Sequence, residues 1–301
     1  MNYLITGGAG FIGSHLVKKL STNKKNKIYI IDLKNKINKT NIIRKVKYIP
    51  GDISKFSTFK KINTNIDIAY HLAAQTSNQI GEEKPKLNYN SNIKGTINFF
   101  NWAIKSKLKK CYFTSSMAVY GNNCKNRKEN SKCYPKSNYG ISKLFGEKII
   151  KNLKKHKIDY IIFRLFNVYG PGQDLENLKQ GMISIYFSQA LKYKSIQVAG
   201  SLKRTRDFIY IDDVLKALTT KSLPCNDIYN LGFGKEIKIY KAIKILSNEM
   251  KKNLPINQIK KTPLDIYSSF ANIDKIKMHG VRPKISLRKG IIKMINKTKK
   301  L

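Results

Sequence analysis

The sequence predicts an α/β protein built on a doubly wound parallel β-sheet, with a smaller lobe in its C-terminal part. Apolar runs of strand length, rich in Ile, Tyr and Phe, alternate with segments in which apolar residues recur three and four positions apart. The runs are nearly free of charged residues, which is typical of strands covered on both faces. Such alternation predicts a parallel sheet with helices on both sides.

The expected elements follow one another along the chain. Six buried strands are predicted at residues 3–6, 28–33, 46–49, 66–72, 111–115 and 160–165. Helices are predicted at residues 11–20, 92–105 and 139–153, where the apolar spacing is helical. After Leu165 the pattern loosens. A turn at residues 170–173 opens an irregular region that contains one further strand-like run, residues 227–231.

Composition excludes several classes of protein. The 301 residues include 59 lysines and arginines against 18 aspartates and glutamates, a formal net charge of +41. Nucleic-acid binders have such a balance, but here the lysines are spread along the whole chain, so no nucleic-acid partner is expected. No segment approaches the roughly 20 apolar residues of a membrane span. The N-terminus carries no targeting segment, so a cytoplasmic protein is expected.

The cysteines indicate no metal or disulfide site. Cys111, Cys124, Cys133 and Cys225 are scattered, without C-x-x-C pairs or histidines at ligand spacing. Reduced thiols are therefore expected, and no metal is predicted.

A glycine-rich loop follows the first predicted strand and opens the first predicted helix. Its sequence, Gly7-Gly8-Ala9-Gly10-Phe11-Ile12-Gly13, has the spacing G-x-x-G-x-x-G. Gly7 and Gly10 let the backbone approach a pyrophosphate, and Gly13 lets the helix pack on the sheet. The helix N-terminus, at Phe11 and Ile12, presents free N–H groups to the phosphates. This arrangement predicts a bound dinucleotide and a Rossmann-type sheet.

Asp32 ends the second predicted strand, 19 residues after Gly13. A carboxylate at this place binds the ribose 2′-hydroxyl of a dinucleotide and repels a 2′-phosphate. NAD is therefore the expected cofactor, rather than NADP.

Tyr139 and Lys143 are the candidate catalytic pair. Their i, i+4 spacing places the phenol and the ammonium on one face of a predicted helix. Ser116 ends the fifth predicted strand, and ligands bind at the carboxyl ends of strands in such sheets. The three side chains together predict a redox site that acts on a hydroxyl group.

The phenol of Tyr139 needs help to act as a base. Its ordinary pKa is near 10, so lowering that pKa by about three units requires roughly 4 kcal/mol. One cation about 5 Å away, at an effective dielectric of about 20, supplies roughly 3 kcal/mol. Lys143 together with the positive nicotinamide ring of NAD⁺ is expected to suffice.

The chain resembles the extended short-chain dehydrogenases/reductases over nearly its whole length. Within them it is most similar to the NAD-dependent nucleotide-sugar epimerase/dehydratase group. Tyr139 and Lys143 carry the resemblance together with the glycine loop and with segments 51–53 (GDI), 71–75 (HLAAQ), 92–96 (NIKGT), 114–121 (TSSMAVYG), 164–171 (RLFNVYGP) and 206–214 (RDFIYIDDV). That many motifs in one order are highly specific.

The resemblance implies roles for further residues. Asp52 and Ile53 would contact adenine, Ala73 and Ala74 would line the cofactor, and Asn92 would support the site. Lys143 would also bind the nicotinamide ribose. Asn167 and Arg206 would reach the phosphates of a sugar nucleotide, to which the fork of a guanidinium is suited.

The resemblance also implies an architecture. An NAD-binding domain would comprise residues 1–165 and about 206–231, and a substrate-binding lobe would comprise residues 166–205 and 232–301. Relatives dimerise through two helices of each subunit, here the predicted helices 92–105 and 139–153. A homodimer with a four-helix interface is therefore expected.

Met117 and Ala118 bear on which of the group's reactions is expected. In 4,6-dehydratases of the group an Asp-Glu pair occupies these positions, and decarboxylating relatives tend to carry a Glu there. Met117 and Ala118 exchange no protons, so elimination is disfavoured. The expected reaction is 4-epimerisation of a UDP-hexose, in which Tyr139 takes the 4-hydroxyl proton, Ser116 holds the 4-oxygen and NAD is regenerated in each turnover.

Ser269 bears on which sugar is used. By resemblance, it lies where enzymes restricted to non-acetylated sugars carry a bulky side chain, so a small residue would admit an N-acetylhexosamine. The alternative is a serine in a surface loop. The chain departs from the family pattern at residues 200–204 and at Val281-Arg282, both in the expected substrate lobe.

Two other classes of function share part of this pattern. A reductase or oxidase of a nucleotide sugar has the same motifs and would consume or produce NADH, and a dehydratase shares the family. A non-catalytic NAD-binding module is disfavoured, because such relatives typically lose the Tyr/Lys pair that this chain retains.

Overall fold

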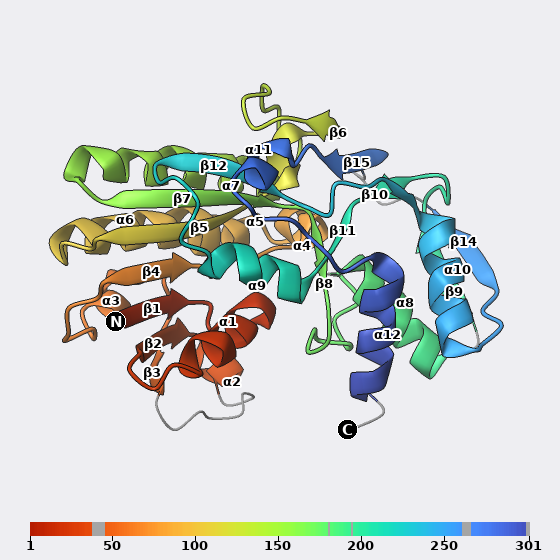
Figure 1. The fold of residues 1–301 in the computed structure, drawn as a ribbon, viewed down its shortest axis with the longest axis horizontal. Helices are drawn as coiled ribbons and strands as arrows, with labels where there is room; N and C mark the ends of the chain where they lie inside the picture. The colour runs from red at the N-terminus through yellow and green to blue at the C-terminus, as the bar shows by residue number, and fades with distance from the viewer. Residues whose placement is uncertain (38–45, 180, 194, 261–265, 299–301) are drawn as a thin grey trace.

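A computed structural model describes residues 1–37, 46–179, 181–193, 195–260 and 266–298. Seven parallel strands form the central sheet, in the order β12–β7–β5–β4–β1–β2–β3 (Figure 1). They are β1 (Asn2–Thr6), β2 (Lys27–Asp32), β3 (Val46–Pro50), β4 (Ile68–His71), β5 (Lys110–Ser116), β7 (Asp159–Leu165) and β12 (Asp227–Leu231). The order reverses at β1, so a switch point lies between β1 and β4. The predicted doubly wound sheet is confirmed.

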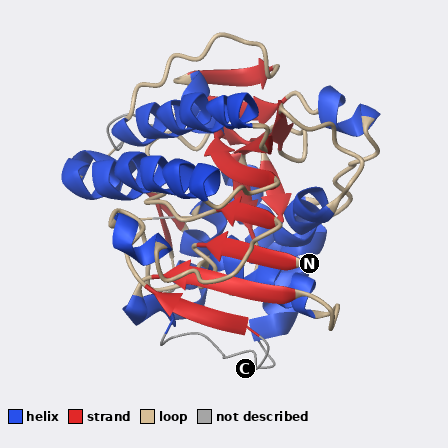
Figure 2. Ribbon diagram, turned by 90° about the vertical axis from the view of Figure 1, so that its left-hand side faces the viewer, coloured by secondary structure: helices blue, strands red, loops and turns tan. Residues whose placement is uncertain are grey.

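Helices cover both sides of the sheet (Figure 2). The predicted helix 11–20 is α1 (Phe11–Ser21), and the predicted helix 139–153 is α7 (Asn138–Lys151), continued by the 3₁₀ turn η3 (Asn152–His156). The predicted helix 92–105 differs at its start: a π-helical turn, η1 (Tyr89–Lys94), precedes α6 (Gly95–Lys105). Such π-turns in helices frequently occur at functional sites.

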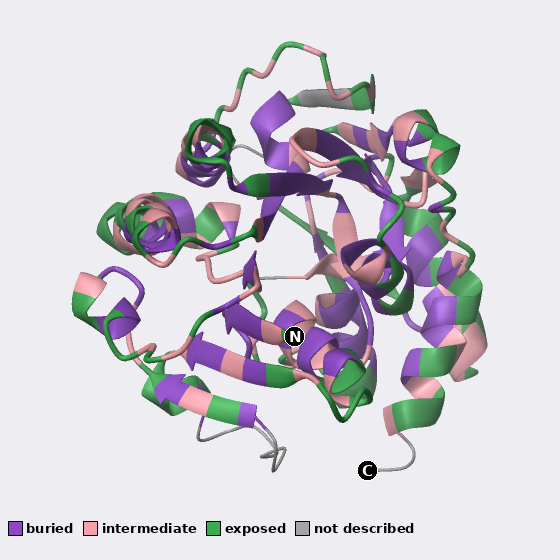
Figure 3. Ribbon diagram, turned by 60° about the vertical axis from the view of Figure 1, so that its left-hand side comes forward, coloured by how far each residue is buried: buried purple, intermediate pink, exposed green. Residues whose placement is uncertain are grey.

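The pleat of the strands divides the core into two layers. In β1, Leu4 faces the layer that contains Phe99 and Trp102 of α6. Its neighbour Ile5 faces the opposite layer, which contains Leu16 of α1. Both layers consist of buried side chains, and exposed residues lie on the outer surfaces of the helices (Figure 3). This double burial explains why the strands read as uninterrupted apolar runs.

An aromatic row crosses the sheet on the α1 side. Tyr70, Tyr112 and Phe163 stack on successive strands, with ring centroids 4.6 Å apart for the first pair and 6.5 Å for the second. The Tyr70 hydroxyl donates to the carbonyl of Leu218 at 3.0 Å, which fastens α9 (Ile211–Thr219) to the row. Cross-strand aromatic pairs of this kind stabilise a sheet.

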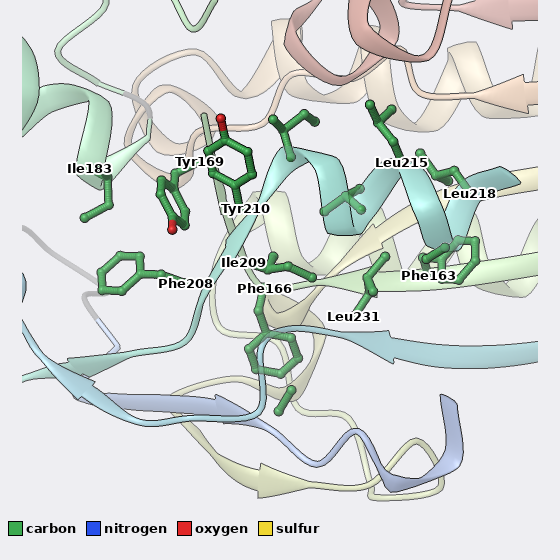
Figure 4. Packing of buried hydrophobic residues seen from close by; sticks show 14 of the residues in the cluster. Phe163, Phe166, Tyr169, Ile183, Phe208, Ile209, Tyr210, Leu215, Leu218 and Leu231 are labelled. Atoms are coloured by element: carbon green, nitrogen blue, oxygen red, sulfur yellow. The ribbon is translucent and has the colours of Figure 1, made fainter. Parts of the chain in front are cut away.

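The C-terminal part is more regular than the sequence analysis predicted. Residues 227–231 form β12 at the edge of the main sheet, parallel to β7. The helices α8 (Met182–Lys192), α10 (Ile239–Met250), α11 (Asp274–Met278) and α12 (Leu287–Thr298) were not predicted. In α10, for example, buried residues do recur at helical spacing, but lysines separate them. Tyr169, Phe208 and Tyr210 pack together between α8 and the sheet (Figure 4).

Short elements complete the described chain. Four two-stranded sheets pair β8 (Asn167–Tyr169) with β11 (Phe208–Tyr210), β10 (Thr205–Arg206) with β13 (Ile237–Lys238), β9 (Ile196–Ala199) with β14 (Ile256–Ile259), and β6 (Asn123–Arg127) with β15 (Ser268–Ala271). The remaining short helices are α2 (Lys34–Ile37), α3 (Phe56–Phe59), α4 (Asn78–Glu83), α5 (Pro85–Asn88) and η2 (Met117–Tyr120). Within the described ranges, every helix is too short or too polar to cross a lipid bilayer.

Candidate active site

The glycine loop joins β1 to α1 at the switch point of the sheet. Gly7 has a positive φ of 74°, and a Cβ there would lie 2.7 Å from the amide nitrogen of Ala73. A Cβ on Gly13 would lie 2.1 Å from the carbonyl oxygen of Gly7. The N-cap of α1 is Gly10, which provides no side-chain cap for the first turn of the helix. The loop therefore brings bare backbone and a helix N-terminus to the carboxyl edge of the sheet.

Asp32 closes the same loop from the neighbouring strand. Its Oδ2 accepts a hydrogen bond from the amide of Ala9 at 2.9 Å, and its Oδ1 accepts one from the amide of Leu33 at 2.8 Å. Burial raises the pKa of Asp32, while these two amides oppose the rise. Asp32 thus holds the glycine loop against β2, and its contact with a ribose stays a prediction.

Asp52 and Ile53 follow β3 on the same edge. The Oδ1 of Asp52 accepts from the amide of Ser54 at 2.8 Å. Ile53 is buried against Gly95, and its carbonyl accepts from the side-chain amide of Asn98 at 2.9 Å. The turn after β3 is therefore anchored to α6, and its contact with adenine stays a prediction.

The segment after β4, which contains Ala73 and Ala74, is held by the π-turn. The Oδ1 of Asn92 accepts from the amide of Gln75 at 2.8 Å, and its Nδ2 donates to the carbonyl of Gln75 at 2.9 Å. The same Nδ2 lies 3.0 Å from the hydroxyl of Ser142 in α7. Asn92 thus ties the segment beside the glycine loop to the helix that carries Tyr139.

Ser116, Tyr139 and Lys143 lie together, as the sequence analysis predicted. Ser116 ends β5, close enough to Tyr139 for its hydroxyl to lower the pKa of the phenol. Ser137 caps α7 by accepting from the amide of Gly140 at 3.0 Å, which places Tyr139 in the first turn. Lys143 lies one turn further, with its Nζ 4.7 Å from the centroid of the Phe113 ring. All three catalytic candidates are buried.

Electrostatics within the protein differ from the expected balance. Burial lowers the pKa of Lys143 to about 7, and the nearby carboxylate of Glu147 opposes this shift. Burial raises the pKa of Tyr139 to about 12, against the hydrogen bond from Ser116, which lowers it. For the protein groups alone, desolvation of the phenol therefore outweighs the favourable effect expected from a neighbouring cation.

Glu147 and Arg164 form a buried ion pair that the sequence analysis missed. The Nη2 of Arg164 lies 2.8 Å from Oε2 of Glu147, and its Nε donates to Oε1 at 2.9 Å. Oε1 also accepts from the hydroxyl of Ser115 at 2.5 Å. Glu147 lies four residues after Lys143, so the helical spacing Tyr-x-x-x-Lys-x-x-x-Glu was the available signal. The pair joins the catalytic helix to β5 and β7.

Met117, Asn167 and Ser269 meet on the other side of Ser116. The sulfur of Met117 accepts from the hydroxyl of Ser269 at 2.7 Å and lies 3.8 Å from Nδ2 of Asn167. Ser269 is fully buried in β15, so the alternative of a surface-loop serine is wrong. Met117 opens η2, directly after Ser116. Three segments distant in the sequence thus converge beside the catalytic hydroxyls.

Asp207 organises the neighbouring backbone. Its carboxylate accepts from the amides of Phe233, Gly234 and Ala271 at 2.7–3.1 Å, and its own carbonyl accepts from the amide of Asn167 at 3.0 Å. Burial raises the pKa of Asp207 to about 6, and the three amides oppose the rise. The adjacent Arg206 is buried, and its Nη1 donates to the carbonyl of Thr205 at 2.7 Å. Asp207 therefore fixes both Asn167 and the strand that bears Ser269.

Other candidate chemistry is not found in the described part of the chain. No group of three His, Cys, Asp or Glu side chains there is arranged to hold a metal ion. Cys111, Cys133 and Cys225 are free thiols, and the side chain of Cys124 lies outside the described part.

A family model described as the NAD-dependent epimerase/dehydratase family matches residues 3–232. The chain belongs to that family. The putative UDP-glucose 4-epimerase of Methanocaldococcus jannaschii is 36% identical over 297 residues, 97% of each chain. UDP-glucuronic acid decarboxylase 6 of Arabidopsis thaliana is 28% identical over 304 residues, 97% of this chain and 87% of the relative.

Among solved structures, a UDP-glucose 4-epimerase of Thermotoga maritima with UDP-glucose is similar, with a TM-score of 0.93 and 28% identity. The match covers 100% of this chain and 99% of the other. The fold and the NAD-dependent chemistry of the family are therefore established for this chain. The reaction and the sugar are not fixed by the family, which includes epimerases, dehydratases and decarboxylases.

In this member of the epimerase/dehydratase family, the residues around the glycine loop fit a bound NAD molecule. The cradle at Gly7 and Gly13 would be filled by any Cβ, so it suits a close-lying pyrophosphate. Gln75 carries the one buried side-chain oxygen or nitrogen of the described residues that lacks a hydrogen-bond partner, its Oε1. Buried polar groups are normally hydrogen-bonded, so this atom is a suitable acceptor for a bound ligand.

Proposed function

We propose that the enzyme interconverts the C4 epimers of a UDP-hexose through a transient 4-keto sugar. One observation carries the proposal. Ser116 lies close to Tyr139 and is followed directly by Met117 and Ala118, which exchange no protons. The site therefore has the groups for moving a proton at one hydroxyl and lacks, at these positions, the acid and base of an elimination. The similarity to UDP-glucose 4-epimerases supports the same reaction.

Different residues of the chain have different roles at the 4-oxygen of the sugar. Tyr139 accepts the proton of the 4-hydroxyl as the keto sugar forms, and returns it when the epimer is made. Ser116 donates a hydrogen bond to the 4-oxygen and holds it against the phenol. Bound NAD⁺ would supply the hydride acceptor for C4 and positive charge near the phenol. Lys143 adds charge from α7 and would hold the nicotinamide ribose, while Asn167 and Arg206 would hold the diphosphate.

The proposal is tested by its products. Purified enzyme is incubated with UDP-glucose and with UDP-N-acetylglucosamine in separate reactions, and the nucleotide sugars are resolved by chromatography. The 4-epimer is expected from at least one sugar, without added NADH and without a net change in absorbance at 340 nm. Absence of a 4-epimer from both sugars would overturn the proposal.

We further propose that the sugar can carry an N-acetyl group. Ser269 is buried next to Met117, and its own small side chain takes up little room at this position. Residues 166–205 and 232–301 are the proposed substrate lobe, and Ser269 lies in its strand β15. Relatives that are restricted to non-acetylated sugars carry a bulky side chain at this position, so a serine here favours a sugar with a 2-acetamido group.

Replacing Ser269 by Tyr is expected to exclude the N-acetylated sugar selectively. A buried phenol at this place would occupy the room for the acetamido group, so kcat/KM for UDP-N-acetylglucosamine should fall by about 10- to 200-fold, the range in which pockets discriminate small groups. The value for UDP-glucose should change much less, and Ser269→Ala is the control for loss of the bond to Met117. Equal losses for both sugars would contradict a gating role.

A nucleotide-sugar reductase is the second candidate, because it would use the same Ser116, Tyr139 and Lys143. It differs in its stoichiometry, since each turnover would oxidise or form one NADH. Net change at 340 nm with the 4-keto or 4-hydroxy sugar would favour it over the epimerase. A dehydratase would instead release a 4-keto-6-deoxy sugar, which the side chains of Met117 and Ala118 disfavour.

We propose that the enzyme is a homodimer through α6 and α7. These helices pack against one another, and their outer face carries the exposed Ile141 and Phe145 beside the half-buried Ile97 and Phe100. Phe145→Glu is expected to give a monomer in sedimentation experiments, because a charge would have to be buried in the interface. Met278→Glu, at an even more exposed apolar residue of α11, should leave the dimer intact. A dimeric Phe145→Glu enzyme would rule out this interface.

A further inference from the structure

His71 is a buried titratable residue to which no step of the proposed reaction assigns a role. It ends β4, in the strand next to the glycine loop, and is only 1% exposed. Its ring stacks on Phe99 with centroids 4.5 Å apart and an interplanar angle of 3°. Phe113 lies on it at 5.7 Å, and the ammonium of Lys143 lies over the ring of Phe113. His71 thus lies one aromatic ring away from a catalytic candidate.

Both ring nitrogens of His71 are hydrogen-bonded to threonines. Nδ1 lies 2.7 Å from the hydroxyl of Thr6, and Nε2 lies 3.1 Å from the hydroxyl of Thr96. The amide of Ala73 also contacts the hydroxyl of Thr6, at 3.3 Å. The hydroxyl of Thr96 also contacts the carbonyl of Asn92, at 2.6 Å. A chain of four hydrogen bonds therefore runs from Ala73 to Asn92 through the imidazole.

The carbonyl end of this chain fixes the proton on Nε2. The carbonyl of Asn92 can only accept, so Thr96 gives its one proton there and accepts from Nε2 of His71. At the other end Thr6 accepts from the amide of Ala73, which leaves its own proton available for Nδ1 of His71. The imidazole is neutral when Nδ1 accepts that proton. Burial, together with the charge of Lys143, lowers the pKa of His71 to about 3, in agreement with this arrangement.

Asn92 also connects the two ends of this hydrogen-bonded chain. The Asn92 side chain binds both the amide and the carbonyl of Gln75, two residues after Ala73. Ser142, which lies beside Asn92, donates to the carbonyl of Tyr139 at 2.8 Å. The segment beside the glycine loop is thus held at two points, and one of these also contacts the helix of the catalytic phenol.

We propose that His71 is a positioning residue of the redox site, whose neutral Nε2–H form fixes residues 73–75 against the glycine loop and the π-turn against α7. Histidine suits the task because it accepts on one edge, donates on the opposite edge and stacks between aromatic rings. Asn or Gln can reproduce one edge only. The proposal rests on NAD binding and on the proposed proton transfer, but its first two tests need no sugar substrate.

The protonation state is tested directly. In wild-type enzyme labelled with ¹⁵N at its histidines, the chemical shifts should show a protonated Nε2 and an unprotonated Nδ1 for His71 from about pH 5 to pH 9. The His71→Gln variant identifies the resonance by its loss. A ring that titrates near its ordinary pKa of about 6.5, or that carries its proton on Nδ1, would overturn the proposal.

Two matched variants test the two edges of the His71 ring separately. His71→Asn can keep the acceptor towards Thr6, and His71→Gln can keep the donor towards Thr96, while both lose the same aromatic stacking. NAD affinity should fall about tenfold in His71→Gln, in which Ala73 loses its anchor, and stay near the wild-type value in His71→Asn. Hydrogen exchange of residues 89–95 should rise in His71→Asn and change less in His71→Gln.

Activity gives the third readout. In His71→Asn, kcat should fall about tenfold with little change in KM, because the π-turn no longer holds α7 firmly. If both variants lose NAD affinity, exchange protection and thermal stability in parallel, His71 is a packing residue only and the proposal fails. Should neither UDP-sugar be epimerised by the wild type, the proposed reaction fails, while the shifts, the NAD affinity and the exchange still decide the role of His71.

Discussion

Tyr139→Phe is expected to lower kcat for 4-epimerisation by about 10²–10⁴-fold, the usual contribution of a general acid–base group. The variant keeps the buried ring at the start of α7 and removes only its hydroxyl. KM should change little, because Asn167 and Arg206, and not Tyr139, are the proposed contacts of the nucleotide part of the substrate. Steady-state kinetics with the preferred UDP-sugar measure both values.

Tyr70→Phe is the matched control for this experiment. Tyr70 is also a buried tyrosine, and its hydroxyl donates to the carbonyl of Leu218 on the face of the sheet opposite to Phe113 and Lys143. Its loss should cost about 1 kcal/mol of stability and leave kcat unchanged. If Tyr139→Phe retained a kcat within a few-fold of the wild type, the phenol would not be the base.

Glu147→Gln is expected to lower the free energy of unfolding by about 3–5 kcal/mol, as for other buried ion pairs that lose one partner. The change leaves the guanidinium of Arg164, which is 3% exposed, without its counter-charge. It also weakens the bond from Ser115 to Oε1. Urea denaturation followed by circular dichroism measures the loss.

Glu176→Gln provides the surface comparison. Glu176 pairs with Lys192, and both side chains are largely exposed, so this change should cost no more than about 1 kcal/mol. Similar, small losses in the two variants would contradict a structural role for the buried pair. A loss in kcat for Glu147→Gln at temperatures where it stays folded would add a role in holding Lys143.

The places of the glycine loop, Ser116, Tyr139 and Lys143 in the fold could be predicted from the sequence because these features are local. The glycine loop is a continuous segment, and Tyr139 and Lys143 lie one helical turn apart, so their proximity follows from helical geometry. Ser116 was placed by the rule that ligands bind at the carboxyl ends of parallel strands. For these residues, spacing along the chain determines proximity in space.

Contacts between distant segments could not be predicted in the same way. Arg164 reaches Glu147 because β7 lies under α7, and nothing in the spacing of the two residues indicates this pairing. Ser269 was placed by family resemblance alone, and only the structure shows it buried against Met117. The π-turn at Asn92 was read as ordinary helix because one extra residue hardly alters the apolar periodicity.

Desolvation was the physical effect that the sequence analysis could not include. A sequence shows which charges are near in the chain, but it does not show how completely a phenol is removed from water. Burial raises the pKa of Tyr139 to about 12 and lowers that of Lys143 to about 7, so both groups are shifted towards their neutral forms. In the proposed reaction, the positive charge that favours the ionised phenol would therefore have to be completed by NAD⁺.

The contact among Met117, Asn167 and Ser269 has a consequence for how sugar preference could change in evolution. Each of the three residues belongs to a different segment, and the sulfur of Met117 touches both partners. Substitutions at residues in contact are rarely additive. New preferences should therefore arise through epistasis, with the benefit of a change at Ser269 depending on which side chain already occupies position 117. None of these three residues belongs to the hydrogen-bonded chain through His71 or is one of the proposed proton-transfer residues Ser116 and Tyr139, so this adaptation can proceed while both stay unchanged.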